Sequence, residues 1–124
     1  MKPISNNKGR LRFSAKLLFQ FRVGTASVMR LCEERIILLT ADSGRGALSL
    51  AKKRGKAAQH HYKNSENVTV HFEFVGVLDL LHLGGECEPD EVWYNLTQRK
   101  LPKERASQIL PPEATLNAIR TLGR

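Results

Sequence analysis

The alternation of apolar and polar residues over 12–23 limits the fold of this chain more than any other feature. Polar residues, with Leu18 as the exception, separate a row of apolar ones: Phe13, Ala15, Leu17, Phe19, Phe21 and Val23. Successive side chains of a β-strand point to opposite faces, so a period of two over this length predicts one long strand with a buried face.

Further strands are predicted on both sides of a helix. Residues 28–41 read as a second strand, reached through a hairpin loop at 24–27, and both of its faces are apolar over 36–40. We therefore expect this strand to lie centrally, covered on both sides. Asp42-Ser43 supplies a helix N-cap, and a stripe of small residues with a spacing of three to four predicts a helix over 45–63.

The second half of the chain predicts two more strands and a closing helix. In the segment 68–83, which predicts a third strand, apolar residues occupy the even-numbered positions from Val68 to Leu80, and Gly76 marks a bulge or a sharp bend. Residues 92–98 predict a fourth strand, a short helical turn covers 103–109, and Pro111-Pro112 starts a last helix that ends at Leu122. The order β-β-α-β-β-α predicts an α+β fold, a curved antiparallel four-stranded sheet with one helix on a face and a C-terminal helix.

Length and composition fit one small domain. A chain of 124 residues with 41% hydrophobic residues can bury one core, so we expect a flexible N-terminal arm over 1–10 and a single α+β domain over 11–124. Two cysteines do not make a disulfide framework, and no apolar run reaches the about 20 residues of a membrane span. We therefore expect a cytoplasmic protein with reduced cysteines and no membrane partner.

Charge is spread unevenly along the sequence. The formal net charge is +8, yet residues 1–63 hold 14 Lys and Arg against three Asp and Glu, whereas residues 64–124 hold six against nine. If the two halves do not interleave in space, the folded protein has a positive and a negative pole. Such polarity favours charged partners: nucleic acid, or a protein with a complementary surface.

Two charged segments are candidate binding sites. Four acids precede two aromatic residues in the loop after the third strand, and a basic protein partner can dock there on Glu86, Glu88, Asp90, Glu91 and Trp93. Phosphates can instead be bound by the basic side of the predicted helix, through Arg45, Lys52, Lys53, Arg54, Lys56 and Lys63. In the plainer interpretation, Trp93 belongs to the core and both charge runs only keep the surface solvated.

No pattern of catalytic or metal-binding residues is present. Four histidines and two cysteines show no CxxC, HExxH or His-x-His spacing, so we expect no metal and no cofactor. A candidate polar cluster is formed by Glu34, Arg35, Glu73 and Asp79, in which Arg35 can bridge to Glu73 or Asp79 across the sheet. An ion pair of this kind is commoner than a catalytic acid pair, so we expect that the protein is not an enzyme.

Four blocks of the sequence resemble a known family. They are Ser14–Phe19, Arg30–Leu38, Phe72–Leu80 and Asp90–Tyr94, and together they are similar to the signature blocks of a small bacterial family of uncharacterised stand-alone domains. The resemblance covers about residues 12–103. It implies a stand-alone domain of about this length without an established activity, and it transfers no catalytic residue.

The leading hypothesis for function is therefore a non-catalytic protein that binds a protein partner. Its most concrete version is a bacterial immunity protein that neutralises a cognate toxin, since complementary charge gives fast and specific association. The alternative hypothesis is a nucleic-acid-binding module that uses the basic helix 45–63. The sequence gives no oligomeric state.

Overall fold

The computed structural model describes residues 11–24 and 29–122. The predicted N-terminal arm and most of the predicted hairpin loop at 24–27 lie outside the described residues. The chain divides into two compact units between Tyr94 and Asn95. The single domain expected over 11–124 stays a prediction.

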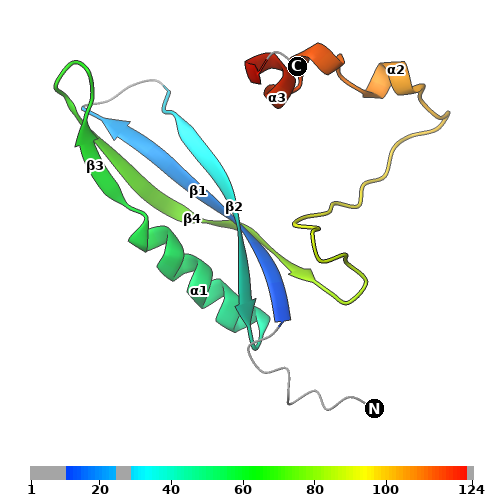
Figure 1. Ribbon diagram of the computed structural model, residues 1–124, viewed down its shortest axis with the longest axis horizontal. Helices are drawn as coiled ribbons and strands as arrows, with labels where there is room; N and C mark the ends of the chain where they lie inside the picture. Colours follow the sequence, from blue (N-terminus) through cyan, green and yellow to red (C-terminus); the bar gives the residue numbers. More distant parts are fainter. Residues whose placement is uncertain (1–10, 25–28, 123–124) are drawn as a thin grey trace. The chain divides into compact units, whose positions relative to one another are not determined.

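The first unit is built on one antiparallel sheet of four strands. These are β1 (Leu11–Val23), β2 (Cys32–Ala41), β3 (His60–Lys63) and β4 (Thr69–Leu83), in the order β2-β1-β4-β3. The sheet is curled, and α1 (Gly44–Ala57) lies along one of its faces (Figure 1). The predicted α+β class and curved four-stranded sheet are confirmed.

The alternating row of β1 supplies the centre of the core, as predicted. Phe13, Ala15, Leu17 and Phe19 are buried. They share their face with Leu39 of β2 and Phe72 of β4, and α1 closes the cluster. Because β1 is hydrogen-bonded on both sides, its apolar row meets partners from every other element of this core.

Register shifts in the β1–β4 ladder interrupt the alternation of β4. Lys16 lies opposite Asp79 but Leu17 lies opposite Val77, and a second shift separates the partners of Leu18 and Phe19. The two shifts flank Gly76, where the sequence predicted a bulge or bend. The prediction of one parity over 68–80 is wrong at Val77, which packs against the core, and at Leu78, which is half exposed. Leu80 packs against the core as predicted.

The helix α1 begins with a cap and lies close to the sheet. The side chain of Ser43 accepts a hydrogen bond from the Gly46 amide, and the buried stripe is Ala47, Ala51 and Gly55. These residues have little or no side chain, so the helix backbone approaches the strands. A Cβ built on Gly55 would lie 2.4 Å from the Phe74 ring.

Three boundaries differ from the prediction. The helix ends at Ala57 and not at 63, because residues 60–63 form β3 and pair with β4. Residues 92–98 form no strand. The second strand is an edge strand and not a central one, and the side chains of Ile36 and Leu38 are 44% and 49% exposed.

The second unit, from Asn95 onward, consists of short helical pieces. These are α2 (Ala106–Ile109), the 3₁₀ turn η2 (Glu113–Thr115) and α3 (Asn117–Leu122). The C-terminal helix exists as predicted, but it begins at Asn117, because Leu116 has an extended backbone with ψ 137°. No residue of these three helices is buried.

Candidate functional site

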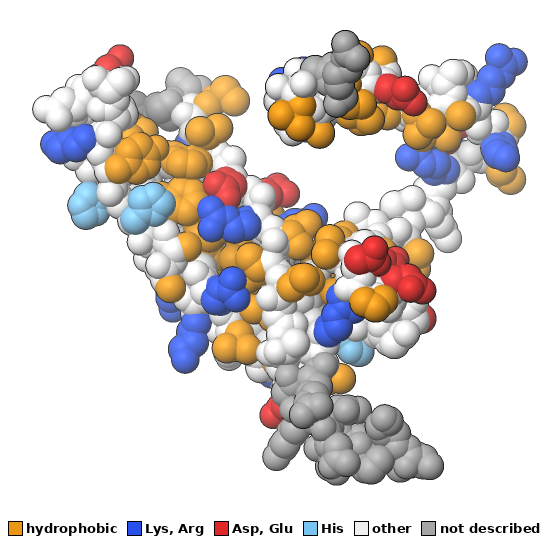
Figure 2. Space-filling model, viewed as in Figure 1, with side chains coloured by type: hydrophobic (Ala, Val, Ile, Leu, Met, Phe, Trp, Pro, Cys, Tyr) orange, Lys and Arg blue, Asp and Glu red, His pale blue; other side chains and the backbone are white. Residues whose placement is uncertain are grey.

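The exposed side of α1 carries positive charge only. The helix holds two arginines and three lysines and no Asp or Glu, and all five cations are exposed. This follows from the buried stripe, which places Ala47, Ala51 and Gly55 against the sheet and leaves the long basic side chains in solvent. Figure 2 shows Lys and Arg side chains along this part of the surface.

Three of these cations form a straight row along the helix. With 3.6 residues per turn, Lys52 and Lys56 lie within about 20° of Arg45 around the helix axis. The rise of 1.5 Å per residue makes this row about 16 Å long. Lys53 lies about 80° to one side of the row, whereas Arg54 lies about 180° from Arg45, beside the sheet. The helix therefore presents a basic surface, the α1 cation face, formed by Arg45, Lys52, Lys53 and Lys56.

Lys63 does not belong to this surface, although the sequence grouped it with the helix. It is exposed on β3, opposite Thr69 of β4. The same register places its neighbour His61 opposite His71, and His71 opposite Arg22. Arg22 alternates with the core residue Phe21, so Lys63 lies on the sheet face opposite α1.

The acidic segment 86–91 is fixed to the sheet by its backbone. Arg12 donates from one guanidinium nitrogen to the carbonyl oxygens of Pro89 and Glu91, both at 3.1 Å. Turn hydrogen bonds join the Cys87 amide to Gly84 and the Glu91 amide to Glu88, both at 3.0 Å. The four acidic residues are exposed, and their carboxylates gather on the loop after β4 (Figure 2).

Trp93 packs against the sheet. The Lys16 ammonium lies over its ring, 4.9 Å from the centroid, and Trp93 is half buried. One residue earlier, the hydroxyl of the buried Ser14 donates to the carbonyl oxygen of Val92. The aromatic residue predicted as an anchor for a partner is thus already partly covered by its own fold.

The predicted polar cluster is divided between the two faces of the sheet. Arg35 pairs with Glu33 at 2.7 Å and stacks over the rings of the core residues Phe19 and Phe72, at 4.8 and 5.5 Å. Glu34 lies opposite Leu18 and Asp79 opposite Lys16. Both therefore lie on the other face of the sheet from Arg35. The expected bridge from Arg35 to Glu73 or Asp79 is therefore wrong.

Glu73 has a different partner, on the face opposite α1. Its carboxylate accepts hydrogen bonds from Gln20 at 3.0 Å and from Arg22 at 3.0 Å. These bonds stabilise the charged carboxylate, first that from Gln20 and then that from Arg22, so they lower the pKa of Glu73 below its ordinary value. A general acid needs the opposite shift, which weighs against that one role for this carboxyl group.

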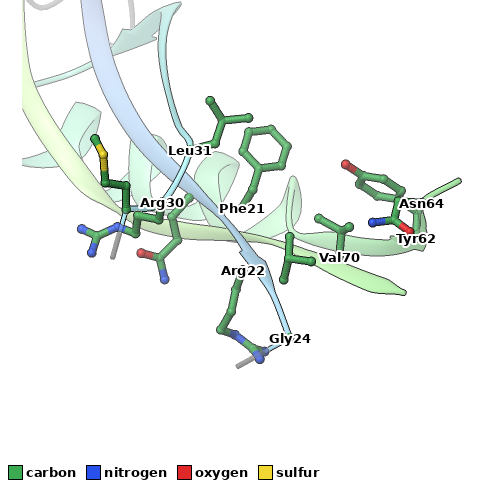
Figure 3. Close-up of a pocket in the computed structure, with 11 residues that line it drawn as sticks. Phe21, Arg22, Gly24, Arg30, Leu31, Tyr62, Asn64 and Val70 are labelled. Carbon is green, nitrogen blue, oxygen red and sulfur yellow. The ribbon is translucent and has the colours of Figure 1, made fainter. Parts of the chain in front are cut away.

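A hollow at the far end of the sheet was missed by the sequence reasoning. It has a volume of about 630 Å³ and is lined by Phe21, Leu31, Tyr62 and Val70, among others. Phe21, Leu31 and Tyr62 point to one side of the strands and Arg22 to the other (Figure 3). It exists because the 13 residues of β1 span about 44 Å and the 14 of α1 only about 21 Å. The helix predicted over 45–63 was longer, which hid much of this mismatch.

The described residues hold no group of three or more His, Cys, Asp or Glu side chains that could bind a metal ion. Cys32 and Cys87 are both free thiols. None of the helices within 11–24 and 29–122 is long and apolar enough to span a membrane.

Comparison with known proteins gives a family without a described activity. No curated protein and no solved structure shows a significant match to the chain. One family matches over residues 12–91, which include all of the sheet except Leu11, the helix α1 and the acidic segment. The chain therefore belongs to the family described as domain of unknown function DUF4288.

Proposed function

We propose that this domain is a non-catalytic module that binds nucleic acid on the α1 cation face. One observation carries the proposal: a 14-residue helix exposes five cations and carries no carboxylate. None of the five forms an ion pair with another described residue. Their charges are therefore free to interact with an anionic ligand.

Phosphate groups are the ligand chemistry that such a surface fits. Lysine and arginine side chains that neutralise phosphates release condensed counterions, and this release dominates the affinity of sequence-independent binding. A row about 16 Å long can contact several successive phosphates of one strand. Contacts to phosphates position a protein without reading the bases, so we expect weak sequence preference.

The test is a binding titration with a labelled DNA duplex over a series of salt concentrations. For four phosphate contacts on this face, the logarithm of the association constant should fall with log salt with a slope of about −3.6. The triple variant Lys52→Gln, Lys53→Gln, Lys56→Gln should reduce this slope by about three and weaken binding at low salt by about 30-fold or more.

A matched control separates the α1 cation face from net charge. The triple variant Lys100→Gln, Lys103→Gln, Arg120→Gln removes the same charge from exposed positions outside the sheet domain. It should retain the slope and most of the affinity. Equal losses in both variants, or no binding at low salt, would refute the proposal.

A protein partner is the second candidate, and the fixed acidic segment 86–91 supports it. The two hydrogen bonds from Arg12 hold its backbone, so its carboxylates need little ordering on binding. This is the surface that a bacterial immunity protein would offer to a basic toxin. Both roles assume the cytoplasmic location predicted from the sequence, which suits two free cysteines.

The two candidates are separated by charge reversal. Glu86→Lys with Glu88→Lys should abolish capture of a stoichiometric protein partner, whereas Glu66→Lys with Glu113→Lys, at exposed positions elsewhere, should retain it. Capture that is equal for both pairs of variants would count against the acidic segment as an interface. Duplex binding through α1 should not weaken in either pair.

A further inference from the structure

A row of basic side chains crosses the sheet on the face opposite α1. The register places Arg22 of β1 opposite His71 of β4, and His71 opposite His61 of β3. Directly opposed residues of antiparallel strands share a face, so these three side chains stand side by side across three strands. The imidazole rings of His61 and His71 are 5.8 Å apart.

Further cations lie at both ends of this row. Lys63 is two residues from His61 on β3, shares its face and is exposed. At the other end, Arg30 is exposed and lines the same hollow as Arg22. Arg22 itself points away from the side that carries Phe21 and Leu31 (Figure 3). Neither Arg30 nor Lys63 forms an ion pair with a described residue.

One carboxylate faces this group, and it is already bound. Glu73 takes its hydrogen bonds from Gln20 and Arg22, and the Arg22–Glu73 ion pair is 2.9 Å long. This pair uses Nε and Nη2 of Arg22 and leaves Nη1 without a partner among the described residues. Positive charge therefore exceeds negative charge here, and it increases when His61 and His71 are protonated.

We propose that Arg22, His61 and His71, with Lys63 and Arg30 at the ends of the row, bind a tetrahedral oxyanion of the phosphate type. Two imidazoles at this spacing can donate hydrogen bonds to two oxygens of one such anion, and charge-assisted bonds of this kind are stronger than neutral ones. The half-exposed side chains suit a phosphate group at the surface, and the site is separate from the α1 cation face.

The affinity should depend on pH through the two histidines. The charged groups that face them are Arg22 on β1, Glu73 on β4 and Lys63 on β3. An anion binds a protonated imidazole more strongly than a neutral one. Binding should therefore be stronger at about pH 5.5 than at about pH 8.

Inorganic sulfate is the probe, because its charge does not change over this pH range. NMR should show shifts of the His61 and His71 ring resonances with added sulfate, and a dissociation constant about fivefold lower at about pH 5.5 than at about pH 8. The titration is carried out first without and then with a chelator. Loss of binding on addition of the chelator would show that a metal ion holds the anion, and would overturn the proposal.

His60 provides the matched control, because it follows the helix on the same short strand but packs against Phe72 of the core, 5.1 Å between ring centroids. His61→Gln and His71→Gln should each reduce the pH dependence, and together remove it, whereas His60→Gln should retain it. Arg30→Gln should weaken binding about threefold at both pH values. Equal effects of His60→Gln and His61→Gln, or unshifted His61 and His71 resonances, would overturn the proposal.

The phosphate group could belong to nucleic acid or to a small phosphorylated molecule. A second set of titrations, with inorganic phosphate and with the DNA duplex, distinguishes these two sources. If the group belongs to nucleic acid, the double variant His61→Gln, His71→Gln weakens duplex binding at about pH 5.5 more than at about pH 8. If it is a small phosphorylated molecule, only the affinity for inorganic phosphate changes. Either result supports the site.

Discussion

Single polar side chains fasten the segment after β4 onto the sheet. Ser14 is fully buried in the middle of the β1 alternation, where the sequence alone suggests a solvent-facing position. Its hydroxyl group donates to the carbonyl oxygen of Val92, 78 residues further along the chain. A serine at this place is therefore an anchor, and its role depends on a contact that no local pattern reveals.

We expect Ser14→Ala to destabilise the protein by about 1–2 kcal/mol, because the Val92 carbonyl loses its donor at a partly buried site. Urea unfolding measures the change. Ser49→Ala, at an exposed position of α1, should alter the free energy of unfolding by less than about 0.5 kcal/mol. Similar values for the two variants would show that the Ser14–Val92 bond adds nothing.

Part of the stability that the fold loses in acid depends on the carboxylate of Glu73. Its pKa is lowered by the hydrogen bonds from Gln20 and Arg22, so the folded state holds the carboxylate more strongly than the unfolded chain does. The resulting stabilisation is present above the unfolded-state pKa and disappears as the pH falls through the lower, folded-state pKa.

In the Glu73→Gln variant, the free energy of unfolding should therefore decrease less steeply with falling pH below about pH 4.3 than it does in the unmodified protein. Urea midpoints measured over this acid range test the expectation, and an NMR titration should give Glu73 a pKa below that of an unstructured peptide. Arg22→Gln should raise the pKa towards its ordinary value. Glu66→Gln, at an exposed turn position, should not change how the urea midpoint depends on pH in this acid range.

At the level of elements, α1 and the sheet are matched by the smallest residues of the helix. Helix propensity favours Ala over Gly by about 1 kcal/mol, so Gly55→Ala would stabilise an isolated helix. In the fold, the new Cβ would lie 2.4 Å from Cδ1 and Cε1 of Phe74, whose ring packs 5.6 Å from that of Phe19. The ring must move and the aromatic contacts must change.

Gly55→Ala should therefore destabilise the protein by a net of about 1–2 kcal/mol, since overpacking outweighs propensity. Gly44→Ala is the control, because a Cβ at Gly44 meets nothing within 4 Å. It should be neutral or stabilising by up to about 1 kcal/mol in urea unfolding. Stabilisation by both substitutions would show that the helix and Phe74 are not closely packed.

The sequence predicted most elements, because their periodicity is local. The strand β1, the strand β4, the cap at Ser43 and the stripe of α1 all follow from spacing alone. The end of the helix did not, because residues 60–63 fit both a helical stripe through Tyr62 and a strand in which His60 and Tyr62 share a face. Pairing with β4 decided between them, and that contact is not local.

Long-range contacts also explain the other errors. Residues 92–94 alternate like a strand, but Val92 and Trp93 meet side chains of β1 and join no ladder. The apolar run 36–39 fits a central strand and also an edge strand with one exposed face, so the sequence pattern does not distinguish the two positions. Of the candidate sites, the helix cations and the acidic segment were readable as charge runs, whereas the His61–His71–Arg22 row exists only through the register.

On the scale of the whole molecule, the two charge poles expected from the sequence are only partly separate. The strand β1 belongs to the basic half of the chain but lies between β2 and β4, so Arg22 pairs with Glu73 and Arg12 binds the acidic segment. What stays separate is local: the α1 cation face and the carboxylates of 86–91.

The boundary after Tyr94 predicts that the sheet domain folds without the rest of the chain. All four strands, α1 and the buried core precede it. A chain that ends at Tyr94 should therefore unfold cooperatively, with a free energy within about 1 kcal/mol of that of the full chain. A much larger loss would favour the single domain over 11–124 that the sequence predicted.

The mismatch in length between β1 and α1 has a consequence for how the sheet opens. The Phe13 end of β1 lies under the helix, whereas the Val23 end borders the hollow and is 45% exposed. Amide protons along this one strand should therefore exchange with solvent at graded rates, slowest near Ala15 and fastest beyond Phe21. In β1, the residues near Ala15 would therefore be among the last of the protein to unfold, and those beyond Phe21 among the first.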